Sequence, residues 1–266
     1  MSSFAEQIAA VDIPETALPD AQPPRIWWHN GAKIAKTPGN FYTKADEFPG
    51  GLAAPWEHDD RFEGEAGFST RTLKIAPLAV RNQPFRKVKD ADGRDRVEYA
   101  RRWEAGMSIH TEILCLMEGY DGAVVWSMKG LTGKAVTGKG GIIATYRNGL
   151  LREAGLIAKK GLPLWAFWLP ISSKMNGDKI AYEDSGFGSL VTPPALVLPD
   201  APLDTLFVGP DVLQRGADVL HDMAAWADYK RLPDNVVEGE VVYAALPAPA
   251  TTGRNVPVAM SANDEF

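Results

Sequence analysis

The 266-residue chain has one cysteine, four histidines and no long apolar run, and each shortage excludes a class of protein. A single cysteine, Cys115, cannot form an intramolecular disulfide, which fits a reducing compartment. The histidines, His29, His58, His110 and His221, do not show the paired ligand spacing of a zinc site. No apolar stretch approaches the roughly 20 residues that cross a bilayer. We therefore expect no metal, no cofactor and no membrane-spanning segment.

Signatures of secretion and of common enzymes are missing as well. The first residues, MSSFAEQIAAVDIPE, do not follow the positive-then-apolar order of a signal peptide, so we expect a soluble, cytoplasmic protein. The sequence contains no G-x-S-x-G nucleophile elbow, no H-E-x-x-H helix and no Cys/His metal pair. It therefore predicts a protein that is not an enzyme.

Positive charge is scarce overall but concentrated in the middle of the chain. The net charge of −6, taken alone, argues against a nucleic-acid ligand. Residues 61–160, however, hold 18 Lys and Arg against 11 Asp and Glu, whereas the rest of the chain holds 10 against 23. Because the electric field at a surface is local, a basic region can bind an anion on an acidic protein. Chance segregation of charge is the alternative.

The stretch from Arg71 to Trp103 combines positive charge with aromatic residues. Its cations include Arg81, Arg86, Lys87, Lys89, Arg94, Arg96, Arg101 and Arg102, and its aromatics are Phe85, Tyr99 and Trp103. A groove that holds an unpaired strand needs both, because cations follow the phosphates and flat rings stack on the bases. The pattern favours single-stranded nucleic-acid binding. The alternative is a charged, solvated β-ribbon whose aromatics form a local core.

Short strands separated by turns predict a mainly β fold. Strand-like alternation covers Phe68–Val80, Val97–Trp103, Met107–Met117 and Ala123–Met128. The turn at Ala91–Gly93 makes the first two a long basic hairpin. A meander of this kind is typical of a barrel or a sandwich.

The N-terminal aromatic residues predict another hairpin. We expect strands at Ile26–Trp28 and Lys33–Lys36, joined by a turn at Asn30-Gly31. Trp27 and Trp28 are adjacent, so in a strand they point to opposite faces. We expect one of them in the core and the other available to a ligand.

Gly133–Lys139 matches the spacing G-x-x-x-x-G-K of a phosphate-binding loop. Gly140 stands where such a loop needs Ser or Thr to bind magnesium. We therefore prefer a flexible Gly/Lys loop whose Lys129, Lys134 and Lys139 contact phosphates non-specifically. A nucleotide-binding enzyme with a degenerate P-loop is the weaker alternative.

The second half of the chain predicts one or two helices beside an apolar segment. Ile142–Lys160 holds mostly helix formers but is interrupted at Asn148-Gly149. The segment is therefore compatible with a helix or with a hairpin. Leu162–Ile171 is apolar enough for core or interface. Asp211–Tyr229 is the clearest helix, with apolar residues at i, i+4, i+7 and i+11. Val241–Leu246 is expected to add an edge strand.

These patterns divide the chain into three parts. Residues 1–24 are rich in proline and acid and are expected to form a flexible arm. Residues 25–246 are expected to form one β domain that includes the helix at 211–229. Residues 247–266 show no periodicity and are expected to be disordered.

The last three residues combine two acids with a terminal phenylalanine. Asp264, Glu265 and Phe266 offer adjacent charges, an apolar anchor and a carboxylate. Such a peptide suits docking in a basic pocket on a partner protein.

Together these features resemble the single-stranded DNA-binding proteins of tailed phages. The resemblance rests on the meander from Arg25 to about Leu198, on the acidic tail ending in Phe266 and on aromatics interleaved with cations. The interleaved aromatics are Trp28, Phe85, Trp103 and Trp126. The resemblance implies an OB-like antiparallel barrel with long hairpin insertions and one or two peripheral helices. It also implies sequence-nonspecific binding of unpaired DNA during phage replication or recombination in the host cytoplasm, with the tail recruiting partner enzymes.

We predict that aromatic residues stack on bases and cations contact phosphates. The predicted nucleic-acid-binding residues are Trp28, Arg71, Lys74, Arg81, Phe85, Arg86, Lys87, Arg101, Arg102, Trp103, Trp126, Lys129, Lys134, Lys139, Tyr146 and Arg147. The predicted partner-binding residues are Asp264, Glu265 and Phe266. No catalytic residue and no metal ligand is predicted. The alternative function is a virion or assembly protein with Leu162–Ile171 as a subunit interface, and a homo-oligomer is compatible with either function.

Overall fold

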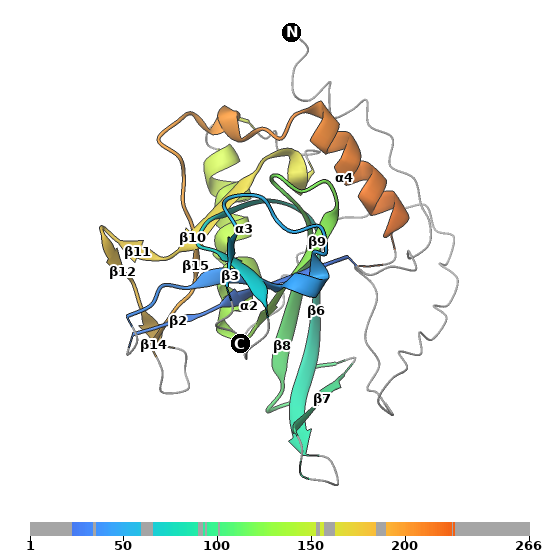
Figure 1. Cartoon of the computed structure of the whole chain (residues 1–266), viewed down its shortest axis with the longest axis vertical. Coiled ribbons are helices and arrows are strands. Elements are labelled where there is room, and N and C mark those ends of the chain that lie inside the picture. The colour runs from blue at the N-terminus through green and yellow to red at the C-terminus, as the bar shows by residue number, and fades with distance from the viewer. Residues whose placement is uncertain are drawn as a thin grey trace. The chain divides into compact units, whose positions relative to one another are not determined.

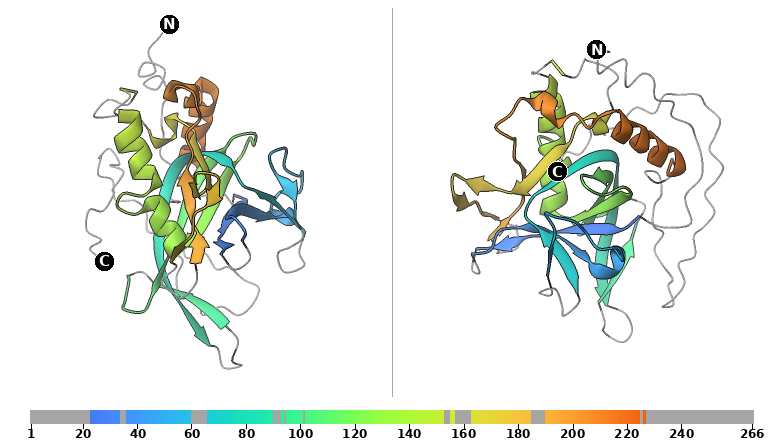
Figure 2. Two further views of the ribbon diagram at one scale, coloured as in Figure 1. Left: turned by 90° about the vertical axis from the view of Figure 1, so that its left-hand side faces the viewer. Right: turned by 45° about the horizontal axis from the view of Figure 1, so that its top comes forward.

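A long, bent strand, β6 (Leu73–Lys89), organises the fold. The computed structural model describes residues 23–33, 36–59, 66–89, 93, 95–100, 102–152, 155–156, 163–184, 190–224 and 226. All of them belong to one compact unit, Met1–Pro233. β6 pairs with β8 (Ser108–Met117), and the register shifts between Pro77 and Ala79. Such a bulge bends a strand, and β6 curves strongly in both views of Figure 2.

The main sheet has ten strands, several of which are labelled in Figure 1. Its order is β15 (Pro194–Leu196), β10 (Leu169–Ser173), β6, β8, β9 (Ala123–Lys129), β1 (Arg25–His29), β3 (Asn40–Lys44), β5 (Gly67–Thr70) and β4 (Glu57–His58), with β7 (Asp95–Tyr99) paired to the far end of β6. Neighbours are antiparallel except β1 and β9, which are parallel. Within the described residues the path of strands is open, ending at β15 and β4. The mainly β prediction is therefore confirmed, but a closed barrel is not formed.

Two small sheets and several short helices surround the main sheet. The small sheets are β11 (Met175–Asn176) with β12 (Lys179–Ile180), and β13 (Glu183–Asp184) with β14 (Leu190–Thr192) and β2 (Gly31–Ala32). The helical segments are η1 (Ala45–Glu47), α2 (Leu131–Thr137), α3 (Ile142–Ala144), the π-helix η2 (Thr145–Leu151), η3 (Leu164–Ala166), η4 (Leu203–Leu206) and α4 (Pro210–Asp222). None of the helices in the described ranges is both long and apolar enough to cross a membrane.

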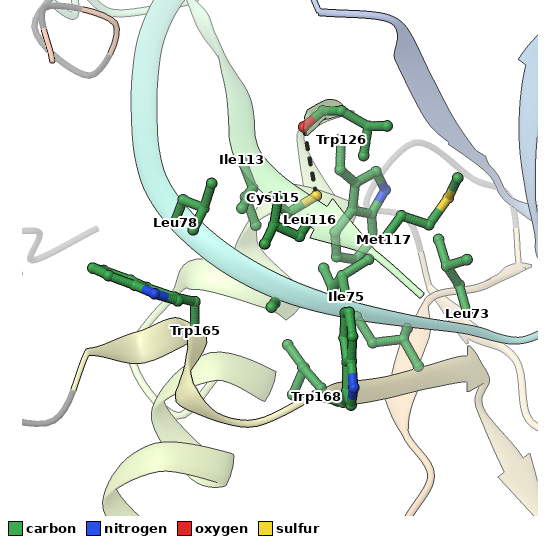
Figure 3. Close-up of a cluster of buried hydrophobic side chains, with 14 of the residues drawn as sticks. Leu73, Ile75, Leu78, Ile113, Cys115, Leu116, Met117, Trp126, Trp165 and Trp168 are labelled. Carbon is green, nitrogen blue, oxygen red and sulfur yellow. Dashed lines mark hydrogen bonds between the residues drawn. The ribbon is translucent and has the colours of Figure 1, made fainter. Parts of the chain in front are cut away.

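The core packs against both faces of the central strands, because the consecutive residues 113–117 of β8 are all buried in it. Ile26, Trp28 and Phe41 pack with Trp126, and the ring centroids of Phe41 and Trp126 are 5.3 Å apart. Cys115 donates its S–H to the Val124 carbonyl across the β8–β9 pair, 3.6 Å away. Figure 3 shows this cluster continuing along β6 to two further tryptophans, Trp165 and Trp168, which are buried. The apolar segment predicted at Leu162–Ile171 is therefore buried from Trp165 to Ile171.

Most of the predicted strands are present, and the predicted basic hairpin is β6 with β7. β1 begins at Arg25, the first residue of the expected β domain. The expected strand Phe68–Val80 is two strands, β5 and β6, divided at Arg71 and Thr72. The interruption predicted at Asn148-Gly149 is absent, because both residues lie inside η2.

The predicted hairpin at Asn30-Gly31 is wrong. β1 pairs with β3 and β9, whereas β2 pairs with β14, so the two strands do not pair with each other. Gly31 serves close packing, because a Cβ there would lie 2.1 Å from the carbonyl oxygen of Thr37. The glycine that suggested a tight turn is required by a close approach of the backbone.

The segment with P-loop spacing is also corrected. Leu131–Thr137 is the helix α2, so neither a phosphate-binding loop nor a flexible Gly/Lys loop occupies these positions. A Cβ on Gly133 would lie 2.7 Å from the hydroxyl oxygen of Thr111, so this glycine lets α2 approach β8 closely. The helix predicted at Asp211–Tyr229 is α4, which ends earlier, at Asp222. The predictions for Val241–Leu246, for residues 1–22 and for residues 247–266 lie outside the described residues.

Candidate nucleic-acid interface

The basic arm is the hairpin that we define as Arg81–Lys89 of β6, β7 and the turn from Arg102 to Met107. Cross-strand pairing runs from Phe85 opposite Tyr99 to Lys89 opposite Asp95. β8 begins opposite Phe85, so beyond this residue the arm is a two-stranded ribbon. A two-stranded ribbon has no layer to bury either face against, which explains why this sequence is so polar. Figure 1 shows the ribbon extending away from the rest of the sheet.

The cations of the ribbon lie at its surface. Lys87, Lys89 and Arg102 are exposed. Arg86 forms an ion pair with its cross-strand neighbour Glu98, at 3.1 Å from Nη2 to Oε2. More than half of the Arg86 side chain is exposed, so this pair contributes little to stability. A phosphate can therefore compete for Arg86 at small cost.

Trp103 is the predicted stacking residue that the structure leaves accessible. Its exposed fraction is 44%, and its Nε1–H donates to the carbonyl of Met107 at 2.9 Å. The amide of Met107 in turn donates to the Glu104 carbonyl, which closes the turn that carries the indole. A hydrogen bond at the edge of the ring restricts its orientation, while 44% of the residue stays exposed. Such a ring beside Arg102 is the chemistry that unpaired bases need.

Phe85 serves a small local core, which corrects the prediction that it stacks on bases. It is 5% exposed, and its ring centroid lies 6.2 Å from that of Tyr99 and 6.1 Å from that of His110. Tyr99 and His110 stack at 5.8 Å, and the Tyr99 hydroxyl lies 3.1 Å from Nδ1 of His110. The Lys129 ammonium lies 5.4 Å from the Phe85 ring centroid. Phe85 therefore holds β7 and Lys129 in place.

Trp28, Trp126 and Tyr146 are core residues, which corrects their assignment to the nucleic-acid interface. Trp126 is completely buried, and Trp28 donates its Nε1–H to the Asn30 side chain and to the Thr192 carbonyl. The hydroxyl of Tyr146 donates to the Trp168 carbonyl at 2.8 Å, and burial raises the pKa of Tyr146. Aromatic content and nearby cations did not distinguish these residues from Trp103.

Trp27 is a residue that the sequence-based list missed. The adjacent pair Trp27 and Trp28 was expected to divide between core and surface, and the structure buries Trp28 and leaves Trp27 half-buried. The ring of Trp27 lies 6.3 Å from that of Tyr42 on β3. The predicted alternation of buried and accessible side chains is confirmed, but the residue assigned to the interface was Trp28 instead of Trp27.

Arg81 is buried and held by an ion pair, so it is not a surface phosphate contact. Its Nε and Nη2 lie 2.6 and 2.5 Å from Oε2 of Glu112. Its guanidinium carbon lies 4.0 Å from the ring centroid of Trp226. Glu112 also faces Arg25, at 3.3 Å. The polar alternation of β8, with His110 and Glu112 on one face, was the sequence signal for this polar cluster.

The remaining predicted cations are spread over the molecule. Arg71 is exposed and Lys74 pairs with Glu118, and both lie near the start of β6, far along the strand from the arm. Lys134 on α2 and Lys139 after it are exposed, and Arg147 is half-buried on η2. The structure therefore places Arg86, Lys87, Arg102, Trp103 and Lys129 on or beside the arm, with Arg86 and Lys87 on opposite faces of β6. Arg101, Asp264, Glu265 and Phe266 lie outside the described residues.

The described side chains hold no group of three His, Cys, Asp or Glu arranged to bind a metal. No protein-family model, no curated protein and no solved structure matches this chain. The arm and its surroundings must therefore be interpreted on their own geometry.

Proposed function

We propose that the protein binds single-stranded DNA without sequence preference and protects it during phage replication or recombination. The observation that carries the proposal is the exposed, hydrogen-bonded indole of Trp103 in the turn of the basic arm. Stacking on Trp103 and phosphate contacts from Lys87, Arg102 and Lys129 are sequence-tolerant interactions. The ligand is thus recognised by its backbone charge and by its unpaired bases.

Recruitment of replication or recombination proteins by Asp264, Glu265 and Phe266 is part of the same proposal. The alternative, an assembly protein, relied on Leu162–Ile171 as a subunit interface. Trp165, Phe167 and Leu169 of this segment are buried within the chain itself, which removes that argument. In this proposal the protein has no catalytic activity of its own.

The test is binding of a fluorescent oligothymidine, measured by anisotropy at low salt, to the parent and to Trp103→Ala. Loss of one stacked ring costs about 1 to 3 kcal/mol, so we expect the affinity to fall by about 5- to 160-fold. Met175→Ala, which shortens another exposed apolar side chain, on β11, is the matched control and should bind like the parent. If the parent fails to bind the oligonucleotide, the proposed function is wrong. If the parent binds and Trp103→Ala binds equally well, the site is wrong.

A further inference from the structure

Part of one face of the central sheet is polar although it is buried. The side chains concerned come from three neighbouring strands, and we call them the polar row: Arg81, Gln83, His110, Glu112 and Ser127. Cross-strand partners share a face, and the register pairs Arg81 with Glu112, Gln83 with His110, and Glu112 with Ser127. The opposite face of the same strands carries the apolar core residues Ile113 and Trp126.

The polar row is internally connected. Glu112 lies between the guanidinium groups of Arg81 and Arg25, and Nε2 of His110 lies 2.7 Å from the Ser127 hydroxyl oxygen. Burying charged groups is costly unless they are paired. Polar side chains normally face solvent or a polar ligand. We therefore ask which residues cover the polar row.

Trp226 covers the row at Arg81. Its ring centroid is 4.0 Å from the guanidinium carbon of Arg81, and its carbonyl accepts a hydrogen bond from Nη1 of Arg81 at 3.3 Å. Trp226 lies in a turn after the end of α4, where its amide donates to the Met223 carbonyl. It therefore reaches the sheet from outside any regular element. Its ring is nevertheless buried, with 3% of the residue exposed, so displacing it requires a ligand that replaces its contacts with Arg81.

A flat ring on a guanidinium plane is also the contact that an unpaired base makes with arginine. Arg81, Gln83 and Phe85 alternate along β6 on one face, so Arg81 is about 13 Å along the strand from Phe85, given the rise of an extended strand. At Phe85, Tyr99 and Lys129 of the arm region converge. The site under Trp226 thus lies on the same sheet face as Phe85 of the arm and Lys129, with the buried Gln83 between them.

We propose that the polar row is a second nucleotide-binding site and that Trp226 holds the place of a base on Arg81 until single-stranded DNA displaces it. The inference rests on the proposed function and specifies a further contact of the same ligand. Trp226 and a base compete for one guanidinium face, so the apparent affinity for DNA is reduced by the fraction of molecules in which Trp226 is docked.

The first experiment follows the tryptophans directly in the full chain. The protein is labelled with 5-fluorotryptophan, the ¹⁹F signals of Trp226, Trp103 and Trp165 are assigned with single Trp→Phe variants, and oligothymidine is added. We expect the Trp226 signal to move toward the position of a solvent-exposed indole and the Trp103 signal to move as its ring stacks. Trp165, a buried indole against α4, is the matched control and should not move.

The second experiment compares the oligothymidine affinity of Trp226→Ala with that of the parent. If Trp226 competes with a base, its removal should tighten binding by about threefold or more. A Trp226 signal that stays in place while Trp103 moves, or a Trp226→Ala variant that folds and binds no tighter, would overturn the inference and leave the proposed function intact. Failure of the proposed function looks different, because then neither anisotropy nor any tryptophan signal responds to the oligonucleotide.

Discussion

Trp103 and Trp126 have similar sequence surroundings but opposite positions in the fold, one at the surface and one in the core. Trp103 and Trp126 both lie among Arg and Lys in the basic middle of the chain. Trp103 is 44% exposed in a turn, whereas Trp126 is completely buried against Phe41. A flat ring can bind a base only where its face is accessible, so Trp103 alone of these two is a candidate ligand contact.

Cys115 leads to a prediction about alkaline stability. Burial raises the pKa of its thiol, so the folded chain keeps the proton when the unfolded chain begins to lose it near the ordinary value of 9.0. Above that pH, loss of the thiol proton stabilises the unfolded state relative to the folded state. The free energy of unfolding should therefore fall by about 1.4 kcal/mol per pH unit. Tyr146 should add to this loss above its ordinary value of 10.0.

The measurement is urea unfolding of the parent and of Cys115→Ala between about pH 8 and pH 11. Cys115→Ala should lack the part of the decline that begins near 9.0 and keep the part that Tyr146 causes. Parallel stability curves for the two proteins would contradict the assignment.

At the scale of elements, pairing between distant segments decides what each strand buries. β1 adds to β9 in a parallel pair, with Ile26 opposite Trp126 and Trp27 opposite Ser127. This register turns Trp28 toward the core and Trp27 toward the polar side. The alternation along β1 was readable from the sequence, but the side that faces inward depends on a strand about 100 residues away.

Two helical glycines make a matched prediction about packing. A Cβ on Gly216 of α4 would lie 2.6 Å from Cδ1 of Trp165, whereas a Cβ on Gly149 of η2 would meet no atom within 4 Å. Gly216→Ala should destabilise the protein by about 1 to 2 kcal/mol, because overpacking outweighs the better helix propensity of alanine. Gly149→Ala should stabilise it by about 0.5 to 1 kcal/mol. Thermal unfolding followed by circular dichroism tests both, and equal shifts of the two variants would refute the packing argument.

At the scale of the whole molecule, an acidic protein presents a basic ribbon. The net charge is −6, yet Arg86, Lys87, Arg102 and Lys129 are all exposed around the arm. Because salt screens distant charges over about 10 Å at 0.1 M, the local cations rather than the total charge determine phosphate binding.

Salt therefore provides a quantitative test of this surface. If the four cations contact one phosphate each, the logarithm of the oligothymidine binding constant should fall against the logarithm of salt with a slope of about −3. Lys87→Gln should reduce the magnitude of the slope by about 0.7, while Lys179→Gln, on the β11–β12 hairpin, should leave it unchanged. Identical slopes for the two variants would show that the arm is not the phosphate path.

The sequence by itself determined the mainly β character, the long basic hairpin and the helix α4, because period-2 alternation, turn residues and helical spacing are local properties. Only the tertiary structure decided that the sheet stays open, that Trp28 and Trp126 belong to the core, and that Arg81 lies under Trp226. These outcomes depend on which distant strands pair and in which register, and in a strand one step of register exchanges the buried face for the exposed one.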